Sequence, residues 1–263
     1  MTEQQIYLKI ESFLKYADKQ LLDAVSLPGG RIRLFAANPE SYNCNYAVIN
    51  QWLDVDETIE AAEEEFAGRD IFPCRFYGAP DSVELEQLRP AFIRHGYSIK
   101  VLEEIHMMAL CQWKKDSCCC EYSTYWQQQE LTPEEKTFVL DSVEGEYALF
   151  HIQRQLRRGC GKMLFAQKGQ TIVGALLYTI QGDTVMISDD YTPLDYAKKE
   201  LVEQLVCLSV QQCRTEQKEL LFARVKGKQA FALYETMGFS PVKMTPLWWA
   251  VKGALPPWLE KQS

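Results

Sequence analysis

The chain has 263 residues, and its 28 Lys and Arg against 36 Asp and Glu give a formal net charge of −8 at pH 7. An apolar content of 47% is enough to build a core, and a charged content of 24% is ordinary for a globular protein, so disorder is not expected for the bulk of the chain. The acidic balance argues against non-specific nucleic-acid binding, which needs a basic surface to displace counterions.

The N-terminal residues have neither the basic start nor the apolar run of a signal peptide, and no apolar run approaches the roughly 18 residues that cross a membrane. We therefore expect a cytoplasmic protein with no membrane partner. The nine cysteines are an odd number scattered through apolar segments, which favours reduced thiols. Three adjacent cysteines, Cys118–Cys120, do not turn easily onto one ion, so we expect a thiol-rich connector and no metal site.

In the first part of the chain, apolar residues recur at near-helical spacing from Ile6 to Leu22, and Gly29-Gly30 ends this pattern. The pattern then predicts strands at 31–36, 46–49, 72–77 and 97–111, and helices at 56–66 and from the capping-box sequence Asp81–Glu84 to Gly96. Residues 112–130 change character and are rich in Lys, Ser, Cys, Tyr and Gln. We take 116–130 as a connector between an N-terminal half, 1–115, and a C-terminal half, 131–263.

The second half opens with a clear helix start, in which Thr132 is the N-cap and Pro133 the first helical residue. Further on, the pattern predicts helices at 148–158, 193–212 and 228–237, and strands at 162–167, 171–180, 184–189, 219–225 and within 239–251. This order predicts an α/β protein with a mixed central sheet flanked by helices. A right-handed crossover makes the strands at 184–189 and 219–225 parallel.

The two halves resemble each other around one glycine in each. Aligning Gly96 with Gly238 places Phe92 on Tyr234 and Tyr97 on Phe239, and a strand, a helix and a strand precede the glycine in both halves. An internal duplication is the natural hypothesis.

Two motifs then carry a family resemblance. Residues 230–239, Ala-Phe-Ala-Leu-Tyr-Glu-Thr-Met-Gly-Phe, resemble the C-terminal signature of the GCN5-related N-acetyltransferases (GNAT), and residues 165–175, with Gly174 after two apolar residues, resemble the central hairpin of that family. The resemblance covers the C-terminal half well, whereas the N-terminal half shows only a shortened form of the same pattern. It implies tandem GNAT-like halves, of which the first is degenerate and the second binds acetyl-CoA.

The resemblance implies acetyl transfer from acetyl-CoA to an amine of a small molecule or peptide. In it, Tyr234 is the general acid that protonates the leaving thiolate, and Asp189 or Asp190 takes the proton of the amine, with Glu144 and Glu146 as further candidates. The start of the helix after this strand offers amides and a dipole to the pyrophosphate. The implied cofactor contacts are Tyr191, Thr192, Tyr196, Ala197, Lys198, Lys199, Leu201, Gly227 and Ala230.

The sequence also departs from the family. The stretch that matches the phosphate loop, 196–201 or one residue later, contains no glycine, and its side chains crowd a phosphate. Asp195 repels the phosphate, whereas Lys198 and Lys199 partly offset that charge. The alternative is therefore a non-catalytic GNAT-like module that binds a ligand or partner.

Several of these residues also have plain structural interpretations. Tyr234 can be interpreted as a core aromatic residue on an amphipathic helix. Asp189 and Asp190 can be interpreted as residues of a solvated turn. His95, His106 and His151 are isolated in the sequence, so no nucleophile triad can be argued. The acceptor's identity and the oligomeric state stay open at this stage.

Overall fold

The computed structural model describes residues 1–21, 23–35, 38–39, 41–42, 44–79, 82–114, 121–142, 145–188 and 199–260, and the side chains in those ranges outside 16–23. The helices are α1 (Glu3–Leu21), α2 (Val55–Ala67), α3 (Leu85–Arg94), α4 (Pro133–Leu140), α5 (Gly145–Arg157), α6 (Lys199–Thr215), α7 (Lys228–Met237) and α8 (Pro257–Glu260). The strands are β1 (Asp23–Leu27), β2 (Gly30–Leu34), β3 (Tyr46–Ile49), β4 (Arg75–Tyr77), β5 (Tyr97–Val101), β6 (Ile105–Leu110), β7 (Ser123–Gln127), β8 (Gly161–Lys168), β9 (Thr171–Gln181), β10 (Thr184–Ser188), β11 (Leu220–Lys226), β12 (Phe239–Val242) and β13 (Trp248–Lys252). Within the described ranges, no helix is both long enough and apolar enough to cross a bilayer.

The chain folds into two compact units, and each unit combines two stretches of sequence. Unit 1 consists of Met1–Phe13 and His106–Met244, and unit 2 consists of Leu14–Ile105 and Thr245–Ser263. Chain order alone predicts two consecutive halves joined by a connector at 116–130. In the structure the chain passes between the units within α1, at the first residue of β6 and before β13, because strand pairing, rather than chain order, groups these segments.

Unit 2 is built on a six-stranded sheet in the order β1-β2-β3-β4-β13-β5. The pair β3–β4 is parallel and the other pairs are antiparallel, so the sheet is mixed. Helices α2 and α3 bury one apolar face each against it, and the Phe76 ring of β4 lies 5.1 Å from the Phe92 ring of α3. These contacts form the core of unit 2.

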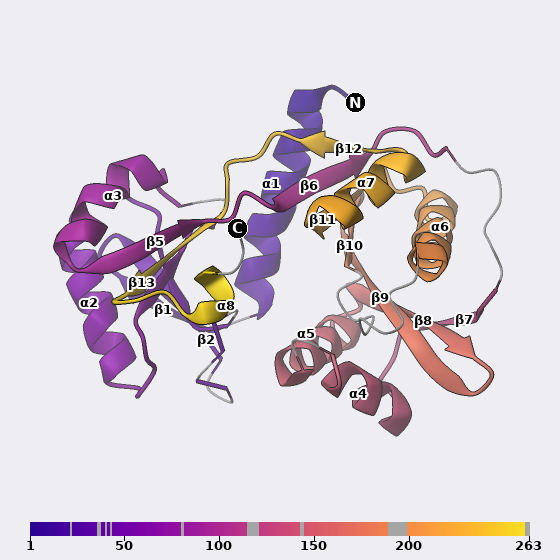
Figure 1. Cartoon of the computed structure of the whole chain (residues 1–263), viewed down its shortest axis with the longest axis horizontal. Coiled ribbons are helices and arrows are strands. Elements are labelled where there is room, and N and C mark those ends of the chain that lie inside the picture. The colour runs from indigo at the N-terminus through magenta and orange to yellow at the C-terminus, as the bar shows by residue number, and fades with distance from the viewer. Residues whose placement is uncertain are drawn as a thin grey trace. The chain divides into compact units, whose positions relative to one another are not determined.

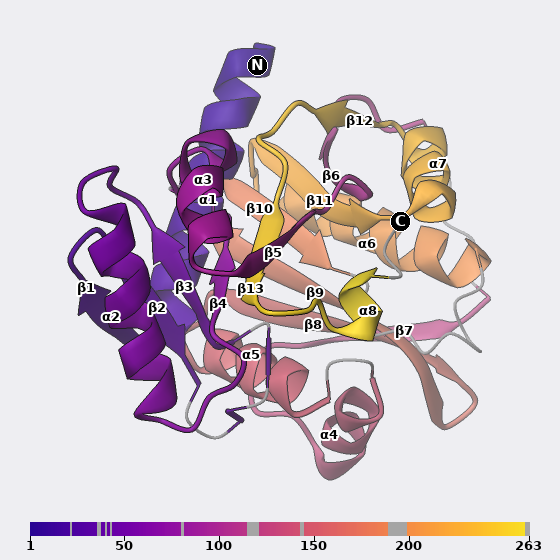
Figure 2. The ribbon, with the colours of Figure 1, turned by 60° about the vertical axis from the view of Figure 1, so that its left-hand side comes forward.

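Unit 1 is built on a seven-stranded sheet in the order β12-β6-β11-β10-β9-β8-β7. The pair β10–β11 is parallel, and β10–β9, β9–β8 and β8–β7 are antiparallel. Helices α6 and α7 cover one face through a cluster that includes Ile187 and Leu205, and α4 and α5 cover the other through a cluster that includes Leu177 and Ile152. Figure 2 shows α4 and α5 together beside β8 and β9.

The two sheets exchange one strand each. Strand β6 comes from the first half of the chain, yet it lies between β12 and β11 in the sheet of unit 1; β13 comes from the second half, yet it lies between β4 and β5 in the sheet of unit 2. The colours of Figure 1 show yellow β13 beside magenta β5. The strands predicted within 239–251 are β12 and β13. Strand β12 joins the sheet of unit 1 through β6, whereas β13 pairs on both sides with strands of the first half.

The predicted α/β class with mixed sheets and flanking helices is confirmed. The order β3–α2–β4–α3–Gly96–β5 in unit 2 matches β10–α6–β11–α7–Gly238–β12 in unit 1, and β3–β4 and β10–β11 are both parallel pairs. Gly96 and Gly238 follow their helices with φ of 76° and 100°, a conformation in which glycine carries no steric penalty. The structural repeat agrees with the duplication inferred from sequence.

The two predicted capping boxes have different outcomes. Thr132 caps α4 as predicted: its hydroxyl accepts from the Glu135 amide at 3.3 Å, and the Glu135 carboxylate accepts from the Thr132 amide at 2.7 Å. The box at 81–84 is wrong, because the N-cap of α3 is Glu84, which makes no side-chain cap, and Asp81 lies outside the described residues.

Candidate functional site

The two neighbouring parallel strands of unit 1 end at the same edge of its sheet. Their paired positions run from Thr184–Leu220 to Ile187–Ala223. Carboxyl ends of parallel strands are where open α/β sheets bind ligands. The predicted residues just after β10, namely Asp189, Asp190, Tyr191, Thr192, Tyr196, Ala197 and Lys198, lie outside the described residues, as does Glu144.

The two faces of this strand pair differ in character. Ala223 and Val225 belong to the apolar cluster under α6 and α7. Because side chains alternate along a strand, Phe222 and Arg224 project from the opposite face, where the Phe222 ring meets Phe13 of α1 with 5.1 Å between centroids. On this face α1 therefore packs on β11, and α4 and α5 lie over β8 and β9, whereas α6 and α7 cover the other face.

The candidate acid, Tyr234, lies on the α6–α7 side, three residues before the end of α7. It is 1% exposed and belongs to the apolar cluster, and its ring meets that of Phe239 edge-on at 5.0 Å. Gly238 lies so close to β6 that an added Cβ would stand 1.7 Å from the Gln112 carbonyl oxygen. The Gly-Phe pair of the motif therefore fixes α7, and with it the phenol, against the sheet.

The described residues of the predicted cofactor site have mixed surroundings. Lys199 begins α6 with its side chain 63% exposed, whereas the Leu201 side chain is fully buried in the cluster beneath α6. Gly227 is the N-cap of α7 with a φ of 79°, and Ala230 packs against the same cluster. A ligand phosphate at the start of α6 can therefore meet the Lys199 side chain, but only the backbone of Leu201.

His151, isolated in the sequence, belongs to a hydrogen-bonded chain on α5. The Thr179 hydroxyl of β9 donates to Gln155 Oε1 at 2.6 Å, and Gln155 Nε2 lies 3.1 Å from His151 Nε2. Since an amide nitrogen only donates, His151 Nε2 accepts and the neutral ring carries its proton on Nδ1. Burial, and after it the charge of Arg224, lowers the pKa of His151 to about 4. In the sequence, the only signal for this arrangement is that His151 and Gln155 are four residues apart, which places them next to each other on a helix.

Of the candidate bases, Glu146 is described. It is exposed on the first turn of α5, the same helix that carries His151. A carboxylate there can accept a proton directly or through a water molecule.

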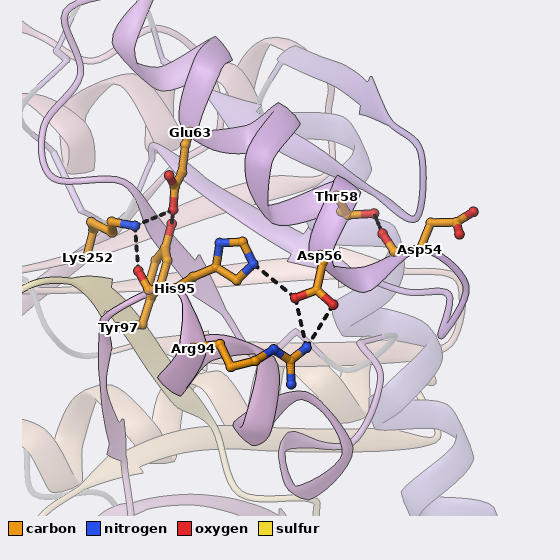
Figure 3. A network of polar contacts seen from close by, with 8 residues as sticks. All are labelled: Asp54, Asp56, Thr58, Glu63, Arg94, His95, Tyr97 and Lys252. Atoms are coloured by element: carbon orange, nitrogen blue, oxygen red, sulfur yellow. Dashed lines mark hydrogen bonds and ion pairs between the residues drawn. The ribbon is translucent and has the colours of Figure 1, made fainter.

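Unit 2 holds a polar network at the ends of its helices (Figure 3). Asp56, in the first turn of α2, accepts from the Arg94 guanidinium with both carboxylate oxygens at 2.8 Å and lies 2.9 Å from His95 Nε2. The hydrogen bonds from Arg94 and then His95 lower the pKa of Asp56. His95, which is isolated in the sequence, thus joins the end of α3 to the start of α2.

The other half of this network joins α2 to two strands. Glu63 of α2 accepts from the Tyr97 hydroxyl at 3.0 Å and from Lys252 Nζ of β13 at 2.8 Å (Figure 3). Burial raises the pKa of the neighbouring Cys74 thiol to about 12, which favours the thiol over the nucleophilic thiolate. Unit 2 has Phe92 where unit 1 has Tyr234, so its repeat lacks the candidate phenol.

The cysteines partly depart from the prediction. Cys74, Cys111, Cys160 and Cys213 carry free thiols, whereas Cys207 on α6 is disulfide-bonded. The expectation of reduced thiols is therefore wrong for Cys207, because spacing along the chain does not reveal which thiols meet in the fold. Cys118–Cys120 lie outside the described residues, and within the described ranges no three His, Cys, Asp or Glu side chains group as metal ligands.

No protein-family model matches the sequence, and no curated protein matches it significantly. Solved structures do resemble it over nearly its whole length. A GCN5-related N-acetyltransferase from Kribbella flavida has a TM-score of 0.66 at 13% identity, covering 95% of this chain and 96% of that one. A protein of unknown function from Staphylococcus epidermidis has a TM-score of 0.57 at 11% identity, covering 97% and 98%. A tandem GNAT protein from the clavulanic acid biosynthesis pathway has a TM-score of 0.55 at 10% identity, covering 96% and 97%. This chain therefore has a GNAT-like fold.

Proposed function

We propose that this protein transfers an acyl group, acetyl in the simplest case, from acetyl-CoA to an amine of a small molecule or peptide. The observation that carries the proposal is the parallel pair β10–β11, with a helix after each strand on the same face and α7 ended by Gly238. In this proposal the start of α6 and the phenol of α7 face the carboxyl ends of the two strands. The GNAT-like fold of the whole chain supports the same reaction class.

The two faces of the strand pair β10–β11 would each hold one reactant. In this proposal the thioester lies on the side of α6 and α7, with its phosphates near Lys199, and Gly227 and Ala230 line its path along α7. The amine approaches from the side of α1 and α5. Holding both reactants across one strand pair converts a bimolecular reaction into an effectively unimolecular one.

Two protons leave the acceptor nitrogen. The acceptor ammonium first loses one of them to a carboxylate, for which Asp189, Asp190 and Glu146 are the candidates. The amine nitrogen then attacks the thioester carbonyl carbon, the carbon–sulfur bond breaks, and the thiolate takes the proton of the Tyr234 hydroxyl. The second proton of the nitrogen restores that hydroxyl, and the carboxylate releases its proton to solvent. Proton transfer from Tyr234 requires the ligand to reach beneath α7, because that side chain is buried.

The substitution Tyr234→Phe tests the acid. General acid catalysis contributes typically about 10²–10⁴-fold, so kcat should fall by about that factor while acetyl-CoA still binds. Tyr122→Phe is the matched control, because Tyr122 is a buried phenol in the same cluster. A Tyr234→Phe protein that loses stability but keeps wild-type kcat would assign Tyr234 to packing alone.

The burial of Leu201 and the lack of glycine at the start of α6 favour one alternative, a non-catalytic module that binds a ligand or partner. Calorimetric titration with acetyl-CoA and with CoA separates the two. Micromolar binding of acetyl-CoA, together with thiol release in the presence of amines, supports the transferase. Absence of binding at millimolar CoA would leave the non-catalytic module.

A further inference from the structure

One face of the sheet of unit 2 carries a buried arginine. Phe76 of β4 belongs to the core under α2 and α3, so its neighbour Arg75 projects from the opposite face. The Arg75 side chain is fully buried, and its Nε donates to the Asn45 carbonyl at 2.5 Å. Its Nη2 donates to the carbonyls of Pro39 and Ser41 at 3.3 and 2.9 Å. The third nitrogen, Nη1, is buried without a hydrogen-bond partner among the described residues.

The positive charge of Arg75 has no negative partner in the part of the chain that the structure describes. No carboxylate there forms an ion pair with it, and the titratable groups that influence its pKa most are the phenol of Tyr42 and the thiols of Cys74 and Cys44. Burial raises the pKa of Tyr42, and that of Cys74 to about 12, so both groups are neutral at pH 7. Three carbonyl oxygens offset part of the charge, but a buried cation that lacks an anion still costs folding free energy.

Aromatic rings lead from this guanidinium towards the surface. The Tyr42 ring lies over it, with 4.0 Å between the guanidinium carbon and the ring centroid. The same ring meets that of Trp258 on α8 edge-on at 5.1 Å, and Trp258 is 42% exposed. Three further rings contact one another or Tyr42, and together the five residues form an aromatic cluster: Tyr42, Tyr46, Tyr77, Trp249 and Trp258.

We propose that unit 2 binds an organic anion whose carboxylate or phosphate accepts from Arg75 Nη1 and whose planar, apolar body lies against Tyr42 and Trp258. Because Nη1 is shielded from solvent, the half-buried Tyr42 side chain turns aside when the anion enters. The site belongs to the repeat that lacks the candidate phenol, and it does not depend on the acyl transfer proposed above.

The two parts of the ligand gain free energy for different reasons. A hydrogen bond from a guanidinium to a carboxylate or phosphate is about twice as strong as one between neutral groups, and at Nη1 it replaces no other bond within the described residues. A planar body beside Tyr42 and Trp258 leaves water and contacts aromatic rings. An anion without a ring, or a ring without a charge, gains one of these contributions and should bind more weakly.

Four probes separate the two contributions, each titrated calorimetrically into the full-length protein without acetyl-CoA. Benzoate has a ring and a carboxylate, phenyl phosphate a ring and a phosphate, benzamide a ring without a charge, and acetate a carboxylate without a ring. Benzoate or phenyl phosphate should bind at least about tenfold more tightly than benzamide and acetate, which corresponds to about 1.4 kcal/mol. The tighter of the two identifies the anion. No binding of either at millimolar concentration, or equal affinity for benzamide or for acetate, overturns the proposal.

Variants assign the binding to this site. Arg75→Met should abolish the preference for the anionic probe over benzamide, but it also removes three hydrogen bonds to carbonyls. Trp258→Leu, at an exposed position, keeps the proposal testable if Arg75→Met does not fold, and it should raise Kd for the preferred anion about tenfold. Trp52→Leu is the matched control, because Trp52 is 55% exposed in unit 2 and lies outside the aromatic cluster. Unchanged affinity in Trp258→Leu, or an equal loss in Trp52→Leu, overturns the proposal.

A last variant examines a carboxylate of the chain itself. Glu40 lies between Pro39 and Ser41 in the sequence and outside the described residues. The proposal predicts that Glu40→Gln leaves the affinity for benzoate and phenyl phosphate unchanged. Anion binding that appears or strengthens only in Glu40→Gln would identify Glu40 as the counter-ion of Arg75 and overturn the proposal. None of the probes is an amine or a thioester, so failure here is distinguishable from failure of the proposed acyl transfer.

Discussion

Replacing Glu216 by Gln removes the one negative charge from a partly buried network in unit 1. The Glu216 carboxylate, at the C-terminal end of α6, accepts from Lys162 Nζ of β8, from Gln212 Nε2 at 2.7 Å and from the Tyr178 hydroxyl of β9 at 3.1 Å. The Lys162 and Glu216 side chains are only 17% and 18% exposed. The change keeps the shape of the side chain and leaves the Lys162 ammonium without its counter-ion.

The magnitude follows from this burial. Removing one partner of a fully buried ion pair costs about 3–5 kcal/mol, and an exposed pair contributes at most about 1 kcal/mol. At this exposure we expect Glu216→Gln to lower the free energy of unfolding by about 2–3 kcal/mol, of the order of 4–12 °C in Tm for a unit of this size. The control is Glu130→Gln, whose Lys136 contact is 3.4 Å long with a 67% exposed carboxylate, and which should cost less than about 0.5 kcal/mol.

The pH dependence gives a second test. Burial by itself raises the pKa of Glu216, but the hydrogen bonds from Lys162 and Gln212 outweigh it and hold the pKa below its usual 4.5. The stabilisation is therefore complete above about pH 4.5 and is lost as the pH falls through the folded-state value. Urea unfolding of wild type and variant at pH 7 and pH 4 measures this. The reasoning would be refuted if Glu216→Gln lowered the free energy of unfolding no more than Glu130→Gln does. It would also be refuted if the difference in unfolding free energy between wild type and Glu216→Gln were as large at pH 4 as at pH 7.

Three further predictions concern the caps and the polar network. Gly238→Ala should cost at least about 3 kcal/mol in urea unfolding, because its φ is 100° and the new Cβ meets the Gln112 carbonyl; Gly159→Ala, with open space around a φ of 65°, should cost only about 1–2 kcal/mol. Equal losses of unfolding free energy in the two variants would contradict the close approach of Gly238 to the Gln112 carbonyl. Thr132→Ala should lower the free energy of unfolding by about 1 kcal/mol through loss of the α4 cap, and Thr132→Ser should restore most of it. Asp56→Asn should cost less than about 1 kcal/mol at pH 7, since the carboxylate is 52% exposed. That cost should fade below pH 3.8 as the depressed pKa of the aspartate is crossed, and a cost that persists in acid would indicate packing instead.

Much of the local structure follows from short sequence signals. The helix predicted at 228–237 is α7 to the residue, because a glycine directly follows it and adopts the left-handed conformation that other residues avoid. Thr132, Pro133 and Glu135 likewise define the start of α4 through bonds between residues three apart. Such signals act within one turn of chain and need no knowledge of the rest.

The candidate site was predictable only in part. The phenol of Tyr234 was singled out by its place in a motif, but its near-complete burial follows from how α7 packs on the sheet. His151 was named only as an isolated histidine and Arg224 was not named, because the two lie far apart in the sequence and the charge of one acts on the other only in the folded chain. Spacing within the chain carries no signal for such a pair.

The sequence by itself determined most of the helices and strands and the repeat around Gly96 and Gly238, since periodicity, caps and glycine conformations are properties of neighbouring residues. It did not predict β1, α8, or β7, which lies inside the expected connector at 116–130. Only the tertiary structure decided which sheet each late strand joins. The exchange of β6 and β13 satisfies the backbone hydrogen bonds of both sheets, and an apolar strand of five or six residues pairs as well with a distant partner as with a near one. Local pattern fixes what a segment is, and long-range pairing fixes where it lies.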